Sequence, residues 1–279
     1  MEAEKRPMDD LKVAAVCMNA APGKVEKNLA RIQSVVLEAS REGANIVCFP
    51  ELSVTGYTLK NPLDIYNQLD SNKAIDQLVR MAQDARLVLI AGLIENASEK
   101  GPFITQVVAG PKGLIGLYRK THLSPHEKKI YTAGDRITVY SSENTSFGVQ
   151  LCYEAHFPEI STIMALKNAD ILFMPHASPR GDAKGKLGSW LRHLKARAFD
   201  NGVYVVACNQ VGNTDEGFSF PGVAVVLGPD GRVLAKHAGE TETILYSVLN
   251  AGMLQDVRQH RMKYFIPQRR PGLYGRIIQ

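Results

Sequence analysis

The sequence predicts an α/β fold in a single domain. Short apolar runs of strand length alternate with longer segments of helical periodicity through most of the 279 residues, which is typical of α/β proteins. The composition, with 45% hydrophobic and 22% charged residues, is that of a globular protein with a sizeable core. No linker-like stretch divides the chain. We therefore predict one domain over residues 1–279, with a C-terminal arm from about residue 250.

The first half of the chain alternates strands with helices and then forms a hairpin. Its apolar runs predict a strand at Leu11–Met18, a helix from about Lys24 to Glu42, a strand at Asn45–Phe49, a helix at Lys73–Arg86, a strand at Leu87–Ile94 and a hairpin of Ile104–Ala109 with Leu114–Tyr118. Gly43 is a typical residue to end the first helix. Polar loops are predicted at Thr58–Gln68 and Thr121–Asp135.

The second half resembles the first in the order of its elements. The same patterns predict a strand ending at Leu151, a helix from Phe157 to about Asn168, a strand at Ile171–Met174, a helix from about Leu187 to Asn201, and strands at Val203–Cys208, Gly222–Leu227, Val233–Lys236 and Thr243–Val248. Pro175 is expected to end the strand before it. An irregular, basic C-terminal segment follows.

The charge and the cysteine content limit which partners and which cellular compartment we expect. The net charge is +5, and the densest basic segment, Arg258–Arg270, lacks a nucleic-acid recognition motif, so we expect a solvated or subunit-contacting tail and no nucleic-acid partner. The charged N-terminus has no apolar signal core, and no apolar stretch approaches the ~20 residues needed to span a bilayer. The cysteines, Cys17, Cys48, Cys152 and Cys208, have no paired spacing and indicate reduced thiols. These features predict a cytoplasmic protein without membrane contact.

Glu51, Lys120 and Cys152 each follow a predicted strand closely. By itself, each residue has an ordinary explanation. Glu51 could be a solvated carboxylate, Lys120 a surface cation and Cys152 a small core residue. One sheet could nevertheless bring all of them to the same edge, where α/β proteins bind ligands. A carboxylate could then remove the thiol proton, and an ammonium could stabilise an oxyanion. The backbone N–H groups of the helix that begins near Cys152 would favour the thiolate.

These residues lie in motifs that resemble the nitrilase superfamily of carbon–nitrogen hydrolases. The motifs are F-P-E-L-S-V-T-G-Y (Phe49–Tyr57), Y-R-K-T-H-L (Tyr118–Leu123) and C-Y-E-A-H-F-P-E (Cys152–Glu159). The resemblance extends to W-L-R-H-L-K-A-R-A-F-D-N (Trp190–Asn201) and R-R-P-G-L-Y (Arg269–Tyr274), so it covers nearly the whole chain.

The resemblance implies an activity and a fold. It assigns Cys152 as the nucleophile, Glu51 as the general base, Lys120 as the oxyanion stabiliser and Glu127 as a residue that positions the substrate. It implies a four-layer α-β-β-α sandwich, a homodimer or higher homo-oligomer, and no cofactor or metal. The expected reaction is hydrolysis of a small amide or N-carbamoyl compound through a thioester, with release of ammonia.

The substrate-binding set is expected to include Tyr57, Tyr153, His156, His176 and Arg180. Tyr153 follows the cysteine where true nitrilases tend to have Trp, which favours amide substrates. His156 stands where amidase-like members often carry Arg, and His176 stands where Asn or Trp is frequent. Arg180 could bind an anionic group of the substrate or be a solvated loop cation.

Three alternatives remain open. The same three catalytic residues could hydrolyse a nitrile. A metallohydrolase could use His122, His126 and Glu127, although Ser124-Pro125 argues against the helix that would align the histidines, and no H-E-x-x-H pattern is present. A binding module could keep the fold without the reaction.

Overall fold

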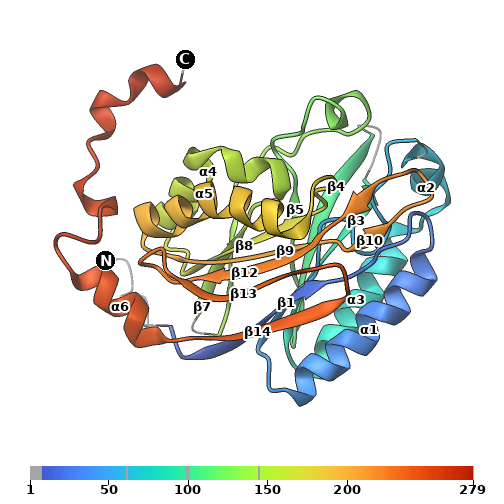
Figure 1. The fold of residues 1–279 in the computed structure, drawn as a ribbon, viewed down its shortest axis with the longest axis horizontal. Coiled ribbons are helices and arrows are strands. Elements are labelled where there is room, and N and C mark those ends of the chain that lie inside the picture. Colours follow the sequence, from blue (N-terminus) through green and yellow to red (C-terminus); the bar gives the residue numbers. More distant parts are fainter. Residues whose placement is uncertain (1–7, 61, 98–100, 144, 279) are drawn as a thin grey trace.

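The computed structural model describes residues 8–60, 62–97, 101–143 and 145–278. In these residues two six-stranded sheets are present (Figure 1). The first sheet has the order β14-β1-β2-β3-β4-β5. Its strands are β1 (Leu11–Cys17), β2 (Ile46–Cys48), β3 (Val88–Asn96), β4 (Pro102–Gly110), β5 (Gly113–Arg119) and β14 (Thr243–Leu249).

The second sheet has the order β13-β12-β9-β8-β7-β6. Its strands are β6 (Val139–Ser142), β7 (Thr145–Val149), β8 (Ile171–His176), β9 (Tyr204–Asn209), β12 (Gly222–Leu227) and β13 (Val233–Gly239). Each sheet has a parallel centre, β1-β2-β3 in the first and β7-β8-β9 in the second, flanked by antiparallel strands. The short pair of β10 (Gly212–Asn213) and β11 (Ser219–Phe220) lies apart from both.

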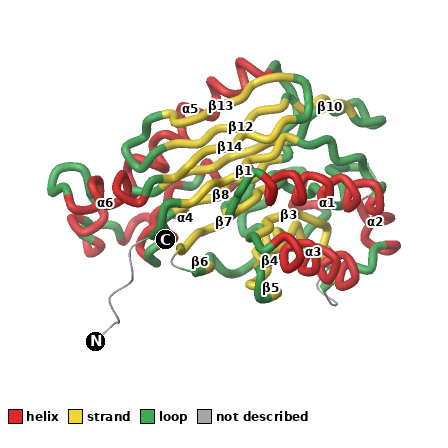
Figure 2. Tube along the Cα trace, turned by 90° about the horizontal axis from the view of Figure 1, so that it is seen from below, coloured by secondary structure: helices red, strands yellow, loops and turns green. Residues whose placement is uncertain are grey.

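The two sheets pack face to face, and helices cover their outer faces. Helices α1 (Val25–Arg41) and α3 (Ser71–Ala85) lie together against the first sheet (Figure 2), while α4 (Pro158–Leu166) and α5 (Ala183–Asn201) cover the second. Strand β1 is covered on both faces, which explains why its sequence is apolar almost throughout. The predicted four-layer α-β-β-α fold is confirmed.

Several predicted boundaries were wrong in ways that have physical reasons. Helix α2 (Pro62–Gln68) occupies part of a predicted loop, strand β6 was not predicted, and β8 continues through Pro175. The last pair between β7 and β8 joins Val149 to Phe173, so Pro175 lies beyond that ladder and no hydrogen bond to β7 is lost.

Helix α5 begins four residues earlier than predicted. Its N-cap is Asp182, whose side chain accepts a hydrogen bond of 2.8 Å from the Gly185 N–H. Gly185 and Gly188 disfavour a helix locally and obscured this first turn in the sequence. The early start places Lys186 on the helix instead of in a loop.

The C-terminal segment is more regular than predicted. Helix α6 (Ala251–Gln259) is capped by Asn250, whose side chain accepts a hydrogen bond from the Met253 N–H. Arg258 of this helix pairs with Asp170 at 2.7 Å. Beyond α6 the chain forms short 3₁₀ turns and extends away from the sheets (Figure 1). A role of this arm in subunit contacts stays a prediction. Among the helices of the described residues, none combines the length and the apolar character that crossing a membrane would require.

Candidate active site

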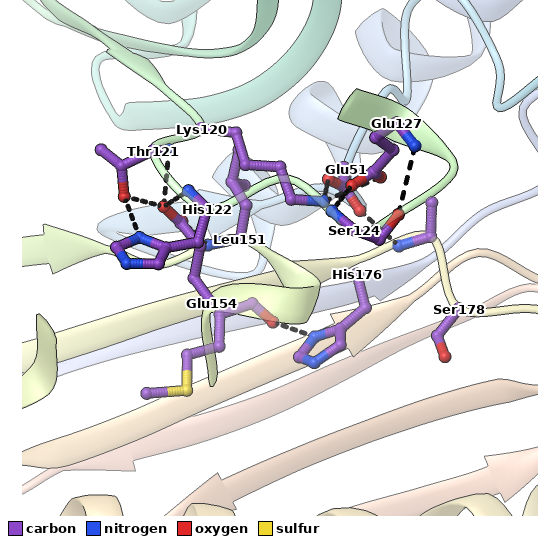
Figure 3. Close-up of polar contacts among 12 residues, drawn as sticks. Glu51, Lys120, Thr121, His122, Ser124, Glu127, Leu151, Glu154, His176 and Ser178 are labelled. Carbon is purple, nitrogen blue, oxygen red and sulfur yellow. Dashed lines mark hydrogen bonds and ion pairs between the residues drawn. The ribbon is translucent and has the colours of Figure 1, made fainter. Parts of the chain in front are cut away.

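The three ionisable residues that follow strands lie near one another between the sheets. Glu51 comes after β2, Lys120 directly after β5, and Cys152 after β7, where it opens a short 3₁₀ helix, η2 (Cys152–His156). The Lys120 ammonium lies 2.7 Å from Glu51 Oε1 and 2.9 Å from Glu127 Oε1 (Figure 3). The side chains of Glu51 and Lys120 have no solvent-exposed surface, so this ion cluster is shielded from water.

The turn that carries Glu51 is fixed from three sides. Its backbone rests on Gly92 of β3, where a Cβ atom would lie 2.5 Å from the Leu52 nitrogen, so only glycine permits this approach. Gln210 donates a hydrogen bond of 2.9 Å to the Glu51 carbonyl oxygen. The Ala177 N–H donates to Glu51 Oε2 at 3.1 Å. The carboxylate is therefore held in one orientation.

Glu127 joins the cluster from the loop after β5. It belongs to a one-turn 3₁₀ helix, η1 (Glu127–Lys129), and its Oε2 accepts a hydrogen bond of 2.7 Å from the Ser124 N–H. Two carboxylates thus share one ammonium. Burial lowers the pKa of Lys120, but the charges of Glu51 and Glu127 outweigh it and raise that pKa well above its usual range. Burial, opposed by Lys120 and assisted by Glu127, raises the pKa of Glu51.

Cys152 has the strained geometry of a residue held in place by its surroundings. Its φ is +42°, in the left-handed region that non-glycine residues seldom adopt. Burial and the charge of Glu51 raise the pKa of the thiol, against the opposing effects of Lys120 and the Ala177 N–H. The net direction favours the neutral thiol, whereas the Ala177 N–H favours the thiolate, as expected of a backbone N–H group.

Glu154 is a structural residue that the motif contained but the sequence analysis did not single out. Its Oε1 accepts hydrogen bonds from the N–H groups of Thr121 at 2.7 Å and His122 at 3.3 Å (Figure 3). The Tyr118 hydroxyl donates to the same oxygen at 3.0 Å. Glu154 Oε2 accepts a hydrogen bond from the Leu151 N–H at 2.6 Å. This fully buried carboxylate ties the turn before the cysteine to the loop after the lysine.

We expect Glu154→Gln to lower the free energy of unfolding by about 2–3 kcal/mol, because a neutral amide replaces a charged acceptor and its NH₂ group meets another donor. Urea unfolding followed by circular dichroism measures this change. Glu159→Gln is the matched control, since Glu159 is an exposed glutamate of the same motif. Equal stability of the two variants would contradict the structural role of Glu154.

A cavity of about 230 Å³ opens beside the ion cluster. Its lining includes the expected residues Tyr57, Glu127, Cys152, Tyr153, His156 and His176. Glu51 and Lys120 lie buried behind it. Arg180 does not line the cavity: its side chain is exposed, and its backbone N–H donates to the Ser219 carbonyl.

The histidines of the cavity are held neutral. His176 Nδ1 lies 2.7 Å from the Met174 carbonyl oxygen, and its ring stacks on Trp190 with 4.0 Å between centroids. Burial lowers the pKa of His176 to about 3. Burial, together with the neighbouring His156, lowers the pKa of His193 to about 4. These rings therefore supply shape and hydrogen-bonding atoms to the cavity without charge.

One face of α5 forms a wall of the cavity that the sequence analysis missed. Its residues are Lys186, Ser189, Trp190 and His193. Their spacing of i, i+3, i+4 and i+7 places them on one side of a helix. This pattern could have been recognised in the sequence if the helix had been predicted to begin before Lys186.

Two of the three residues of the metallohydrolase alternative have other partners. His122 contacts Thr121 Oγ1 at 2.8 Å and the Phe157 ring at 4.4 Å, and Glu127 is engaged by Lys120. Within the part of the chain described, no group of three or more His, Cys, Asp or Glu side chains is arranged to hold a metal ion.

Comparisons with known proteins agree with the motifs. The chain is 29% identical over 276 residues to a nitrilase from Pyrococcus abyssi, which covers 95% of this chain and 100% of the relative. It is 30% identical over 257 residues to an omega-amidase from Mus musculus, covering 88% and 91% of the two chains.

A solved structure of an amidase from Nesterenkonia sp. AN1 with acrylamide added to its active-site cysteine aligns with a TM-score of 0.77 and 28% identity, covering 89% of this chain and 96% of that one. The sequence model of the carbon-nitrogen hydrolase family matches residues 12–259. With a family match that spans nearly the whole chain and a shared fold, this protein belongs to the carbon-nitrogen hydrolases.

Proposed function

We propose that the protein hydrolyses a small amide or N-carbamoyl compound through a thioester on Cys152, with release of ammonia. The observation that carries this proposal is the buried cluster of Glu51, Lys120 and Glu127 beside a strained cysteine at one end of a small cavity. The printed names of the relatives support an amide substrate, since they include an omega-amidase and an amidase.

Acylation begins with a neutral thiol. Glu51 takes the proton from Cys152 as the sulfur attacks the carbonyl carbon, so the thiolate forms only during the attack. Negative charge then develops on the carbonyl oxygen. Lys120 stabilises this oxyanion together with the N–H of Tyr153, which as the second residue of η2 has no carbonyl acceptor within that helix.

The carbon–nitrogen bond breaks when the tetrahedral intermediate collapses. Glu51 returns its proton to the departing nitrogen, which leaves as ammonia, and the acyl group stays on sulfur as a thioester. Water then attacks the thioester while Glu51 takes one of its protons. The sulfur leaves, recovers that proton from Glu51, and releases the acid. The raised pKa of Glu51 suits a group that must both accept and donate this proton.

The test is an assay for released ammonia with a panel of small amides, N-carbamoyl compounds and nitriles. We expect ammonia from amides and a thioester adduct of Cys152 in the intact mass of enzyme quenched during turnover. Ammonia from nitriles alone would favour the nitrilase alternative. No turnover, together with no faster alkylation of Cys152 than of the other thiols, would favour a non-catalytic binding module.

The pH profile tests the role of Glu51. The base must be ionised to accept the thiol proton, so kcat/KM should fall as pH drops through the pKa of Glu51. Because burial raises that pKa, the midpoint of this acid limb should lie above the ordinary glutamate value of about 4.3. A kcat/KM series at constant ionic strength measures it. A midpoint below the ordinary value would contradict this assignment.

A further inference from the structure

Lys186 stands out among the residues that line the cavity. Of the described lining residues, only Glu127 and Lys186 carry a charged side chain, because the histidines are neutral and Cys152 is a thiol. Glu127 is already paired with Lys120. Lys186 is thus the one cation on the cavity wall in the part of the chain that the structure describes.

The Lys186 ammonium has neutral partners only. Its Nζ donates to Ser178 Oγ at 2.9 Å and to the Pro179 carbonyl oxygen at 3.0 Å. Among the described residues, no carboxylate lies within 4.0 Å of it to form an ion pair. Burial and the charge of Arg180 lower the pKa of Lys186, against an opposing effect of the Cys152 sulfur. A neighbouring carboxylate would also raise this pKa. A half-buried ammonium without a counter-ion is costly unless a ligand supplies one.

The described residues in and behind the cavity wall carry charges of both signs. At the inner end of the cavity, two carboxylates share the single ammonium of Lys120, which leaves an excess of negative charge around the reacting groups. On the α5 wall, Lys186 supplies positive charge, and the α5 N-terminus adds a favourable dipole for an anion. A substrate with a neutral amide at one end and an anion at the other fits this pattern in only one direction.

We propose that Lys186 binds a carboxylate at the end of the substrate remote from the scissile amide. The substrate class is then a small amide that also carries a carboxylate, such as the monoamide of a short dicarboxylic acid. The volume of about 230 Å³ is below the ~300–1,000 Å³ of typical drug-sized ligand sites and suits such a molecule. Ser189 accepts a hydrogen bond from Arg192, so its own hydroxyl hydrogen can be donated to the same carboxylate. This inference rests on the proposed amide hydrolysis.

The test compares three amides that differ in the charge of the remote end: succinamic acid, butyramide and γ-aminobutyramide. We expect the wild-type enzyme to have the highest kcat/KM for succinamic acid. In Lys186→Met, the kcat/KM ratio of succinamic acid to butyramide should fall by about 10–100-fold, mainly through KM, because one charged contact is lost. In Lys186→Glu, the preference should shift to γ-aminobutyramide.

Two further measurements distinguish a failure of this inference from a loss of fold and from a failure of the proposed function. Arg180→Gln, which removes a nearby cation outside the cavity, should keep the wild-type ratio. Calorimetric titration of succinamic acid into Cys152→Ala should show binding that Cys152→Ala/Lys186→Met weakens by about tenfold or more. Ratios and affinities that do not depend on residue 186 would overturn the inference. Binding that depends on Lys186, without turnover of any amide by the wild-type enzyme, would instead overturn the proposed reaction and retain the carboxylate site.

Discussion

Replacing Cys152 with alanine is expected to lower kcat for amide hydrolysis by at least ~10³-fold while the fold stays intact. The sulfur forms the covalent bond to the acyl group in the proposed mechanism, so no other group can replace it in the thioester route. The free energy of unfolding should change by less than about 1 kcal/mol, because the substitution removes a single desolvated atom beside Glu51. Ammonia release and urea unfolding measure the two effects.

Cys17→Ala is the matched control for this variant. Cys17 is fully buried in the core between the sheets, whereas Cys152 is the partly exposed cysteine of the cavity. Cys17→Ala should therefore keep its activity, and iodoacetamide should label Cys152 in the native wild-type protein. Ammonia release by Cys152→Ala at the wild-type rate would refute the proposed nucleophile.

Replacing Lys120 with methionine is expected to be the most destabilising single change at this site. The substitution leaves Glu51 and Glu127 buried without their shared counter-ion, which should cost about 3–5 kcal/mol of stability near neutral pH. The kcat should also fall by about 10²–10³-fold, because the oxyanion loses its ammonium. Urea unfolding and the ammonia assay measure these changes.

The pH dependence of the Lys120→Met protein gives a sharper test. Without the ammonium, the pKa of Glu51 rises further above its unfolded value, so the folded state binds more protons than the unfolded state. The lost stability should therefore return in part as pH falls from about 7 to about 5. Glu127→Gln in the same background should also restore part of it. The exposed Lys112→Met serves as the control and should change stability by less than about 0.5 kcal/mol. Equal stability of the two lysine variants would contradict the buried cluster.

The fold was largely predictable because its strands and helices have strong periodicity. The parallel strands covered on both faces gave continuous apolar runs, and α1 and α3 gave clear apolar stripes. The errors lie where local signals are weak or conflict with tertiary packing. Strand β8 passes through Pro175 because β7 no longer pairs with it there, a fact that no local pattern records.

The sequence by itself determined which residues could perform the chemistry. Glu51, Lys120 and Cys152 each follow an apolar run and lie in distinctive motifs. The expectation that one sheet carries all three was wrong, because Glu51 and Lys120 follow strands of the first sheet and Cys152 follows a strand of the second. The substrate-facing residues were less predictable, since they come from loops and from one face of α5.

Only the tertiary structure decided the charges and contacts that surround these groups. It placed Arg180 outside the cavity and Lys186 on its wall, because α5 begins at Ala183 despite two early glycines. It also brought to Glu154 the donors Tyr118 and Thr121, which lie more than thirty residues away in the chain. The physical reason is that periodicity reports which face of an element is buried, whereas ion pairs and desolvation depend on distances between elements.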